Sequence, residues 1–426
     1  MPFETISVVG LGYIGLPTAA MFASRKKQVI GVDINQYAVD TINRGEIHIV
    51  EPELDMIVRA AVTEGYLRAT TSPEPADAFL IAVPTPFLPT SNENEVPQPD
   101  LRYIESAAKA IAPVLKKGDL VILESTSPVG ATEQLAAWMA EVRPDLSFPQ
   151  HAGIEADVNV AHCPERVLPG HVVRELVEND RVIGGMSERC SERSVALYKA
   201  FVEGECVITN ARTAEMAKLT ENSCRDVQIA FANELSLICD ELDINVWELI
   251  SLANRHPRIN ILQPGPGVGG HCIAVDPWFI VSKTPELARL IKTARGVNDG
   301  KPGWVVDKVK AAIADFLMAN PQRTADSIKL ACFGLAFKAN IDDLRESPAL
   351  DIVKELCQMH PGDVLAIEPN IHTLPESLQG KCELVSTEAG LEHADVAVML
   401  VDHREFIELE SKPENLIIVD TRGVWL

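Results

Sequence analysis

The chain has 426 residues, 46% of them hydrophobic and 23% charged, which indicates two or three folded domains and excludes an intrinsically disordered protein. Its 38 Lys and Arg residues against 61 Asp and Glu residues give a formal net charge of −23, which argues against a nucleic-acid partner and a polybasic membrane tether. The nine Cys residues have neither metal-binding nor disulfide-framework spacing, so we expect a reducing, cytoplasmic environment and no metal site.

The first predicted elements are a strand at residues 6–9, a glycine-rich turn at residues 10–15 and a helix at residues 18–24. The run from residue 5 to residue 24 carries no charge and could be mistaken for a signal sequence or a membrane span. However, Gly and Pro residues interrupt it, and Glu4 precedes it where a signal would carry Lys or Arg. We therefore expect strand–turn–helix structure, no targeting segment and no membrane insertion.

The glycine-rich turn has the spacing of a dinucleotide-binding site. Gly10, Gly12 and Gly15 follow a strand and open a helix, and Asp33 ends the next predicted strand, residues 29–32. Such glycines let the backbone approach a pyrophosphate, and the helix amino terminus favours its negative charge. A carboxylate at the end of the second strand would accept ribose hydroxyls and repel a 2′-phosphate. The pattern predicts NAD rather than NADP; the alternative is a purely structural glycine turn.

Further strands are predicted at residues 79–83 and 120–124, with helices at residues 104–115 and 132–141. Strands that alternate with helices favour a parallel sheet that is covered by helices on both faces. Five Pro residues between residues 84 and 99 predict a long irregular loop after the first of these strands.

Residues 211–242 predict a single long helix. The stretch contains no Gly or Pro, and Phe231, Leu235, Ile238 and Leu242 follow one another at steps of four, three and four. A helical block between two α/β regions usually joins them, and an apolar stripe on it is a natural dimer surface. We therefore expect a homodimer formed through this helix.

The remaining pattern predicts a second α/β region. A helix is expected at residues 246–253, a loop rich in Gly and Pro at residues 257–277 and another helix at residues 305–317. Helices such as residues 349–358 then separate strand patterns at residues 328–333, 364–367, 396–401 and 417–419. The sequence thus predicts an α/β fold of two doubly wound, Rossmann-like domains, residues 1–208 and 319–426, joined by a central helical domain, residues 209–318.

Cys272 is the first candidate for chemistry. It follows Gly269, Gly270 and His271 in a loop where backbone and ligand can come close, and Asp276 lies four residues further on. A reactive thiol and an inert, packed thiol are both compatible with this pattern, whereas we expect the other eight Cys residues to be inert. His271 could be a base, although solvent exposure or a structural hydrogen bond is the commoner role of a loop histidine.

Several polar residues are further candidates, each with an ordinary alternative. Glu215, Lys218 and Asn222 share one face of the long helix and form either a site or a solvated polar stripe. Glu165 and Arg166 stand where a strand would run out into a loop, and this Glu could be an ordinary surface carboxylate. Two basic residues near the second α/β region could hold a diphosphate or form surface salt bridges, namely Lys338 and Arg345.

Seven segments in this order resemble the UDP-glucose/GDP-mannose dehydrogenase family over nearly the whole chain. They are residues 10–17, 83–86, 124–130, 163–166, 215–222, 265–276 and 337–348. The loop at residues 258–279 further resembles the UDP-N-acetyl-D-mannosamine dehydrogenase branch of this family. One segment departs from the pattern, because Glu368-Pro369-Asn370 stands where many relatives carry an aromatic-Asp-Pro sequence.

The resemblance implies a four-electron oxidation in which the 6-hydroxyl of a UDP-sugar becomes a carboxylate, two NAD are reduced and one water is consumed. The branch implies UDP-N-acetyl-D-mannosamine as the substrate and its uronate as a precursor of a bacterial surface polysaccharide such as enterobacterial common antigen. The alternatives are a UDP-glucose or UDP-N-acetylglucosamine 6-dehydrogenase, a one-step hydroxyacid dehydrogenase without covalent catalysis, and a nucleotide sensor without turnover.

The family also implies roles for named residues. Cys272 would carry a thiohemiacetal and then a thioester, and Glu165 would activate the water that hydrolyses the thioester. Lys218 and Asp276 would remove the hydroxyl proton, Lys218 and Asn222 would stabilise charge on the substrate oxygen, and Thr126 with Glu124 would shape the nicotinamide end and the attacking water. The residues expected to bind NAD are Gly10, Gly12, Tyr13, Ile14, Gly15, Asp33, Thr85, Thr126 and Arg345. The residues expected to bind the UDP-sugar are Glu165, Arg166, Val167, Lys218, Asn222, Arg258, Gly265, Gly269, Lys338 and Arg345.

Overall fold

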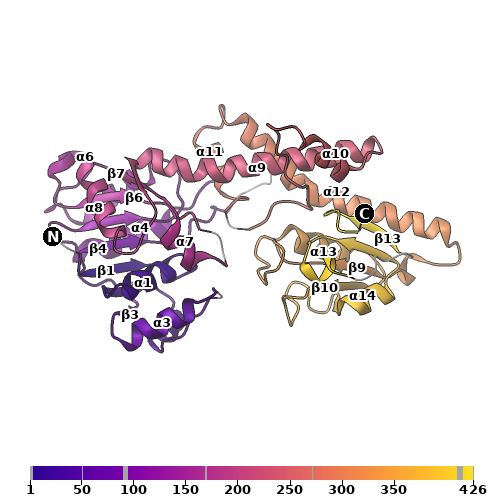
Figure 1. Ribbon diagram of the computed structural model, residues 1–426, viewed down its shortest axis with the longest axis horizontal. Coiled ribbons are helices and arrows are strands. Elements are labelled where there is room, and N and C mark those ends of the chain that lie inside the picture. The colour runs from indigo at the N-terminus through magenta and orange to yellow at the C-terminus, as the bar shows by residue number, and fades with distance from the viewer. Residues whose placement is uncertain are drawn as a thin grey trace. The chain divides into compact units, whose positions relative to one another are not determined.

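A computed structural model describes residues 3–49, 51–89, 95–167, 170–270, 272–409 and 416–425 of the chain. The chain divides into two compact units (Figure 1): unit 1 comprises Met1–Glu221 and Trp278–Pro285, and unit 2 comprises Asn222–Pro277 and Glu286–Leu426. In the described residues, no helix combines the length and the apolar character that crossing a membrane requires. The three-domain division with boundaries after residues 208 and 318 stays a prediction.

The sheet of unit 1 has the strand order β3-β2-β1-β4-β5-β6-β7-β8. The predicted parallel arrangement holds from β3 to β6, but β7 pairs antiparallel with β6, so β7 and β8 run in the opposite direction. Central strands such as β4 and β5 are wholly buried, which explains their unbroken apolar sequences. The strands are β1 (Thr5–Val9), β2 (Gln28–Val32), β3 (Leu67–Thr70), β4 (Ala78–Ile81), β5 (Leu120–Leu123), β6 (Asn159–His162), β7 (Arg181–Gly185) and β8 (Cys206–Asn210).

Helices cover both faces of this sheet. Residues of α1, α3, α7 and α8 form one apolar core against it, and residues of α4 and α5 form a second core on the opposite face. The predicted strand–turn–helix at residues 5–24 is confirmed by β1 and α1. The helices of this region are α1 (Gly15–Ser24), α2 (Gln36–Asn43), α3 (Leu54–Thr63), α4 (Arg102–Ile111), η1 (Ala112–Val114), α5 (Ala131–Val142), α6 (Pro149–Ala152), η2 (Gly153–Glu155), α7 (Val172–Glu178) and α8 (Glu188–Tyr198).

The central helices were predicted with unequal success. The long helix α9 (Ala211–Glu241) and the following α10 (Val246–Ala253) agree with the sequence pattern. The predicted loop at residues 257–277 ends slightly earlier, because α11 (Asp276–Lys283) begins within it. The expected helix at residues 305–317 is much longer, because α12 (Arg289–Ala319) continues through Pro302.

Packing against α9 explains why α12 begins so early. Gly has a low helix propensity, and Pro302 cannot donate a backbone hydrogen bond. The first half of α12 therefore has little helical propensity of its own. Nevertheless, Arg295, Asn298 and Lys301 on this part of α12 are buried. Arg295 donates to Asp226 on α9 at 2.6 Å. These tertiary contacts override the local preference.

The sheet of unit 2 is wholly parallel, in the order β11-β10-β9-β12-β13, which repeats the order of the first five strands of unit 1. Residues of α12 and α13 pack on one face, and residues of α14 and α15 on the other, so the predicted pair of doubly wound domains is confirmed. The remaining elements are η3 (Ala325–Ser327), β9 (Leu330–Phe333), α13 (Pro348–Met359), β10 (Val364–Ile367), β11 (Glu383–Leu384), α14 (Thr387–His393), β12 (Val396–Met399), α15 (Arg404–Ile407) and β13 (Ile417–Asp420).

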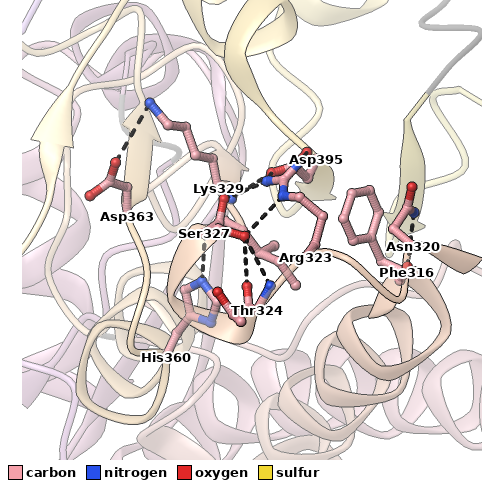
Figure 2. A network of polar contacts seen from close by, with 10 residues as sticks. Phe316, Asn320, Arg323, Thr324, Ser327, Lys329, His360, Asp363 and Asp395 are labelled. Carbon is pink, nitrogen blue, oxygen red and sulfur yellow. Dashed lines mark hydrogen bonds and ion pairs between the residues drawn. The ribbon is translucent and has the colours of Figure 1, made fainter. Parts of the chain in front are cut away.

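A polar network fixes the amino end of β9 (Figure 2). Thr324 and Ser327 form a capping box around η3, and Arg323 forms an ion pair with Asp395 at 2.8 Å. The ring of the buried His360 lies 2.9 Å from the carbonyl oxygen of Ile328. This network secures the end of the sheet opposite to the strand ends where doubly wound domains bind ligands.

Candidate active site

The turn after β1 has the shape that a dinucleotide requires. Gly10 has a φ of +90°, and a Cβ there would lie 2.5 Å from a backbone oxygen of the loop after β4. A Cβ on Gly15 would lie 1.7 Å from the carbonyl oxygen of Gly10, so both positions need glycine. Gly12 and Tyr13 are exposed on the turn, and α1 begins after Ile14 without a side-chain cap among the described residues. This amino end fits a pyrophosphate.

Asp33 lies at the carboxyl end of β2, beside the turn. One of its carboxylate oxygens accepts from the Leu11 amide at 2.8 Å and the other accepts from the Asn35 amide at 2.9 Å. Because Asp33 is only half-buried and each oxygen can accept again, the carboxylate can also bind ribose hydroxyls. The Thr85 hydroxyl donates to the Thr126 carbonyl at 2.6 Å and links the loops after β4 and β5. These groups fit NAD.

Replacing Asp33 by Ala is expected to weaken NAD binding by about tenfold to a hundredfold, the loss expected when charge-assisted hydrogen bonds are removed. UDP binding should change little, because Asp33 follows β2 in unit 1, whereas Lys338 and Arg345, the residues expected to hold the UDP part, belong to unit 2. Calorimetric titrations of the same variant with NAD and with UDP measure both effects. Equal losses of affinity for the two ligands would contradict the assignment of the NAD site.

Glu165 follows β6 and is part of a buried cluster of charges. One of its oxygens accepts from the Arg166 amide at 2.7 Å, and the other lies 3.0 Å from the guanidinium of Arg181. Arg181, the first residue of β7, is buried beneath the ring of Tyr198. The Tyr198 hydroxyl donates to Glu124 at 2.6 Å. Because Glu165 is only 7% exposed, the alternative of an ordinary surface carboxylate is wrong.

Burial dominates the electrostatics of this cluster. It raises the pKa of Glu124 to about 7, although attraction to Arg181 opposes the shift. Burial likewise raises the pKa of the nearby Cys163 thiol to about 12, which is consistent with the inert packing predicted for this residue. Sequence reasoning missed Arg181; a charged residue at the start of a buried strand was the only available signal.

In the unaltered chain, ionisation of the buried Glu124 destabilises the folded state as the pH rises. The Glu124→Gln variant is expected to lack this destabilisation. The pKa of Glu124 rises from 4.5 to about 7 on folding, so between these values the folded chain holds a proton that the unfolded chain has released. The stability that this proton contributes is therefore lost as the pH rises through the window. Since Gln cannot ionise, the variant should gain up to about 3 kcal/mol relative to the unaltered chain by about pH 8. Urea unfolding at about pH 5 and about pH 8 tests this, and an equal difference at both values would contradict it.

Glu215 does not lie on a solvated stripe. It is buried, and one of its oxygens accepts from the amide and the hydroxyl of Thr132, at 2.8 and 2.6 Å. The other oxygen accepts from the Gly130 amide at 2.7 Å. Glu215 therefore caps α5 and ties α9 to the loop after β5. Lys218, one turn further along α9, is half-exposed.

In unit 2 the Cys loop is joined to α9. The Asn222 amide group donates to the Asp276 carboxylate at 2.5 Å, and Asp276 is buried as the first residue of α11. The backbone amides of Val275 and Asp276 donate to the Cys272 carbonyl at 3.1 and 2.9 Å. The loop thus carries the exposed Cys272 close to Asn222 and Asp276. His271 lies outside the described residues.

A buried amide chain, which sequence reasoning missed, supports the start of this loop. The Asn233 side chain accepts from the Gly265 amide and donates to Asn298, each at 2.9 Å. Asn298 in turn donates to Asp226, which also binds Arg295. These hydrogen-bonded side chains therefore connect the Cys loop to the packed helices α9 and α12.

The predicted substrate residues near β9 are exposed or tightly packed. Arg345 forms a two-pronged ion pair with Asp343, at 2.6 and 2.8 Å, and Lys338 is exposed. A Cβ on Gly269 would lie 2.3 Å from the carbonyl oxygen of Glu346, so this glycine is needed for packing of the Cys loop on the segment that carries Arg345.

The other predicted substrate residues have varied surroundings. Arg166 pairs with Glu221 at 2.7 Å, Val167 packs against the core around α1, and Arg258 is exposed. Cys224 is exposed as well, so the prediction that it packs as a core residue is wrong.

Comparison with known proteins decides the family. The chain matches the UDP-glucose/GDP-mannose dehydrogenase family in three consecutive parts: the NAD binding domain at residues 4–202, the central domain at residues 212–300 and the UDP binding domain at residues 331–426. The chain belongs to the UDP-glucose/GDP-mannose dehydrogenase family. The resemblance stated from the sequence is confirmed, and so is NAD as the cofactor.

Curated relatives of this dehydrogenase family match the chain from end to end. The UDP-N-acetyl-D-mannosamine dehydrogenase of Yersinia pestis is 69% identical, with 100% of both chains covered. The NDP-N-acetyl-D-galactosaminuronic acid dehydrogenase of Ralstonia nicotianae is 67% identical over 99% of this chain and 96% of the relative. A solved UDP-D-ManNAc dehydrogenase from Pyrococcus horikoshii is 38% identical, with a TM-score of 0.85 over 99% of this chain and 96% of that one. The chain is an NAD-dependent oxidoreductase of nucleotide sugars.

Proposed function

We propose that the chain oxidises the 6-hydroxyl of UDP-N-acetyl-D-mannosamine to the carboxylate of UDP-N-acetyl-D-mannosaminuronate. The observation that carries the reaction is the Cys loop. Its Cys272 carbonyl accepts from the Asp276 amide at 2.9 Å, and the Asp276 carboxylate accepts from Asn222 at 2.5 Å. The choice of N-acetyl-D-mannosamine as the sugar is supported by the names of relatives that are 67% to 69% identical. The product would serve a bacterial surface polysaccharide such as enterobacterial common antigen, made from the cytoplasm.

The reaction removes four electrons from one carbon. One primary alcohol, two NAD⁺ and one water give one carboxylate, two NADH and three protons, with NAD⁺ accepting a hydride at each oxidation. We assign the NAD site to the turn from Gly10 to Gly15, Asp33, Thr85, Thr126 and Arg345. We assign the UDP-sugar site to Glu165, Arg166, Val167, Lys218, Asn222, Arg258, Gly265, Gly269, Lys338 and Arg345.

In the first oxidation, a base must take the proton of the 6-hydroxyl. Lys218 and Asp276 are the assigned groups, acting through water. The hydrogen bond from Asn222 leaves Asp276 as an oriented carboxylate beside the Cys loop. Lys218 and Asn222 stabilise the negative charge that develops on the substrate oxygen, and one such donor contributes about 3–4 kcal/mol in a transition state.

In the second oxidation, the Cys272 thiolate adds to the aldehyde carbon and gives a thiohemiacetal, so the reactive aldehyde cannot leave. Loss of a further hydride converts the thiohemiacetal into a thioester. Glu165 then takes a proton from water, the resulting hydroxide attacks the thioester carbon, and the carbon–sulfur bond breaks. The carboxylate is released and Cys272 is regenerated.

A second candidate substrate is an N-acetyl-D-galactosamine nucleotide. The relative from Ralstonia nicotianae, named an NDP-N-acetyl-D-galactosaminuronic acid dehydrogenase, is 67% identical, close to the 69% of the Yersinia pestis relative. Overall sequence identity to these relatives therefore does not decide between the two sugars.

A panel of nucleotide sugars tests the proposal. UDP-N-acetyl-D-mannosamine, UDP-N-acetyl-D-galactosamine, UDP-N-acetylglucosamine and UDP-glucose are each incubated with the full-length protein and NAD⁺, with NADH and product mass measured. We expect the mannosamine sugar to have the highest kcat/KM and to yield the uronate. A higher kcat/KM for another sugar would mean that this other sugar is the substrate. Binding of a nucleotide sugar without NADH formation would favour the nucleotide sensor.

We further propose a homodimer formed through α9. Of the four residues of the predicted apolar stripe, Phe231, Ile238 and Leu242 are 53%, 45% and 60% exposed, whereas Leu235 is partly buried. Most of the stripe is therefore uncovered in the single chain. Replacing both Phe231 and Ile238 by Asp should therefore convert a dimer into a monomer in light scattering. Leu287→Asp, at an exposed apolar position outside α9, is the matched control. A double variant that remains a dimer would contradict this interface.

A further inference from the structure

The segment that departs from the family pattern supplies a buried carboxylate to unit 2. Glu368 directly follows β10 and is only 4% exposed. One of its oxygens accepts from the amides of Leu335 and Ala336, at 2.8 and 3.0 Å, and lies 3.0 Å from Nε2 of His403. The other accepts from the amide and the side chain of Asn370, both at 3.1 Å. All of the donors come from loops at the carboxyl end of the sheet.

This carboxylate occupies the place that Asp33 has in unit 1. Gly334 and Gly10 follow the first strand of their sheets with φ values of +97° and +90°. In both loops the amide of the next leucine donates to the acid that ends the neighbouring strand, at 2.8 Å. However, Asp33 is half-buried and each of its oxygens accepts one hydrogen bond, whereas Glu368 is buried, with three hydrogen-bond partners at one oxygen and two at the other. Glu368 therefore shapes the loop rather than binding a ribose.

His403 extends this arrangement to the loop that carries Lys338. The ring atom Nδ1 accepts from the backbone amide of Asn340 and faces the side chain of Asn370, both at 3.0 Å. A backbone amide can only donate, so Nδ1 carries no proton and the ring hydrogen is on Nε2, where it donates to Glu368. Burial alone would raise the pKa of Glu368, but the bonds from His403 and the amides outweigh it and hold this pKa below its usual value.

Asn340 is held at two points. Besides its amide bond to His403, its side-chain oxygen accepts from the Arg404 amide at 2.9 Å. Its φ of +61° lies in the left-handed region, so these bonds maintain a conformation that Asn adopts but most residues avoid. Asn340 lies two residues after the exposed Lys338, and the Ser347 hydroxyl closes the loop by donating to the Leu335 carbonyl at 2.7 Å.

We propose that Glu368 and His403 are positioning residues for the nucleotide: they hold the backbone from Leu335 to Asn340 in the shape that presents Lys338 to the diphosphate of the UDP-sugar. This inference rests on the proposed function, because it takes UDP as the ligand of this loop. Glu368 fixes the beginning of the loop, and His403 fixes its middle by accepting the Asn340 amide. Glu368 is thus the carboxylate that anchors this loop.

The test compares two replacements of His403 in the full-length protein. Phe retains the ring packing against Phe406 but removes the ring's hydrogen bonds to Glu368, Asn340 and Asn370. Asn keeps a side-chain oxygen near the place of Nδ1. We expect about tenfold weaker UDP binding for His403→Phe, the loss of one well-aligned hydrogen bond to the loop. His403→Asn should recover most of the affinity. The KM for the UDP-sugar should rise with the UDP dissociation constant, while kcat and NAD binding stay within about twofold.

His360→Phe is the matched control, because His360 is also a buried histidine of unit 2 but lies at the opposite end of the strands (Figure 2). It should lower stability without weakening UDP binding. Asn340→Ala, at an exposed position, leaves the buried pair intact and should weaken UDP binding several-fold even where His403→Phe fails to fold.

The outcomes separate the inference from the proposed function. If the unaltered protein binds UDP and its variants His403→Phe and Asn340→Ala bind equally tightly, the inference is overturned and the proposed function stands. If His360→Phe weakens UDP binding as much as His403→Phe, the effect is general destabilisation and the inference is also overturned. If the unaltered protein binds no UDP, the proposed function itself fails.

Discussion

The Cys272→Ala variant is expected to form uronate at least about a thousandfold more slowly than the unaltered enzyme, because removal of a covalent nucleophile eliminates a reaction path rather than a single contact. Without the thiol, an aldehyde can still form but cannot be held, so NADH should not exceed one per sugar. The measurement is the initial rate of NADH formation together with the mass of the product.

Cys224 provides the matched control for this variant. It is also exposed and lies on α9, close in sequence to Asn222, but has no place in the proposed reaction. Cys224→Ala should therefore retain near-normal uronate formation. Unchanged uronate formation by Cys272→Ala would rule out covalent catalysis by this thiol. One NADH per sugar, unaffected by the substitution, would favour a one-step dehydrogenase.

The Glu165→Gln variant is expected to accumulate the thioester on Cys272. Gln keeps the size of Glu165 and can still accept from the Arg166 amide, but it cannot take a proton from the hydrolytic water. Both oxidations should therefore proceed once and hydrolysis should become rate-limiting. Intact-mass spectrometry at saturating substrate and NAD⁺ should show the added mass of the acyl UDP-sugar.

Glu178→Gln is the control for this experiment, since Glu178 forms an exposed ion pair with Arg174 at the end of α7. It should turn over normally and show no adduct. Unmodified Glu165→Gln protein under the same conditions would mean that another group activates the water.

The features that the sequence predicted well are those encoded by neighbouring residues. The helix α9 follows from an uninterrupted apolar spacing, and the turn from Gly10 to Gly15 follows from backbone approaches that only glycine permits. The alternation of strands and helices similarly indicated both doubly wound sheets. In each case the signal lies within one short segment.

The features that could not be predicted from the sequence depend on contacts between distant segments. Glu215 caps α5 from 83 residues away, and the side chain of Arg295 reaches Asp226 across 69 residues. The early start of α12 and the reversed direction of β7 are set by packing rather than by local preference. No local sequence pattern indicates which distant residue will form a hydrogen bond with a buried acid.

The candidate site shows the same contrast. Cys272 and Asp276 were identifiable from one loop, but the bond between Asp276 and Asn222 joins residues 54 positions apart. Glu165 was a candidate from its position after a strand, but its role came only from the family resemblance, because the local sequence does not indicate its burial against Arg181. The role of Glu368 likewise required the positions of His403 and of the loop after β9.

The most direct test of the central claim counts NADH when the sugar is limiting. With excess NAD⁺ and a known amount of UDP-N-acetyl-D-mannosamine, the unaltered enzyme should form two NADH per sugar, and product mass spectrometry should find the uronate without free aldehyde. One NADH per sugar, with the 6-aldehyde released into solution, would contradict retention of the half-oxidised sugar by Cys272.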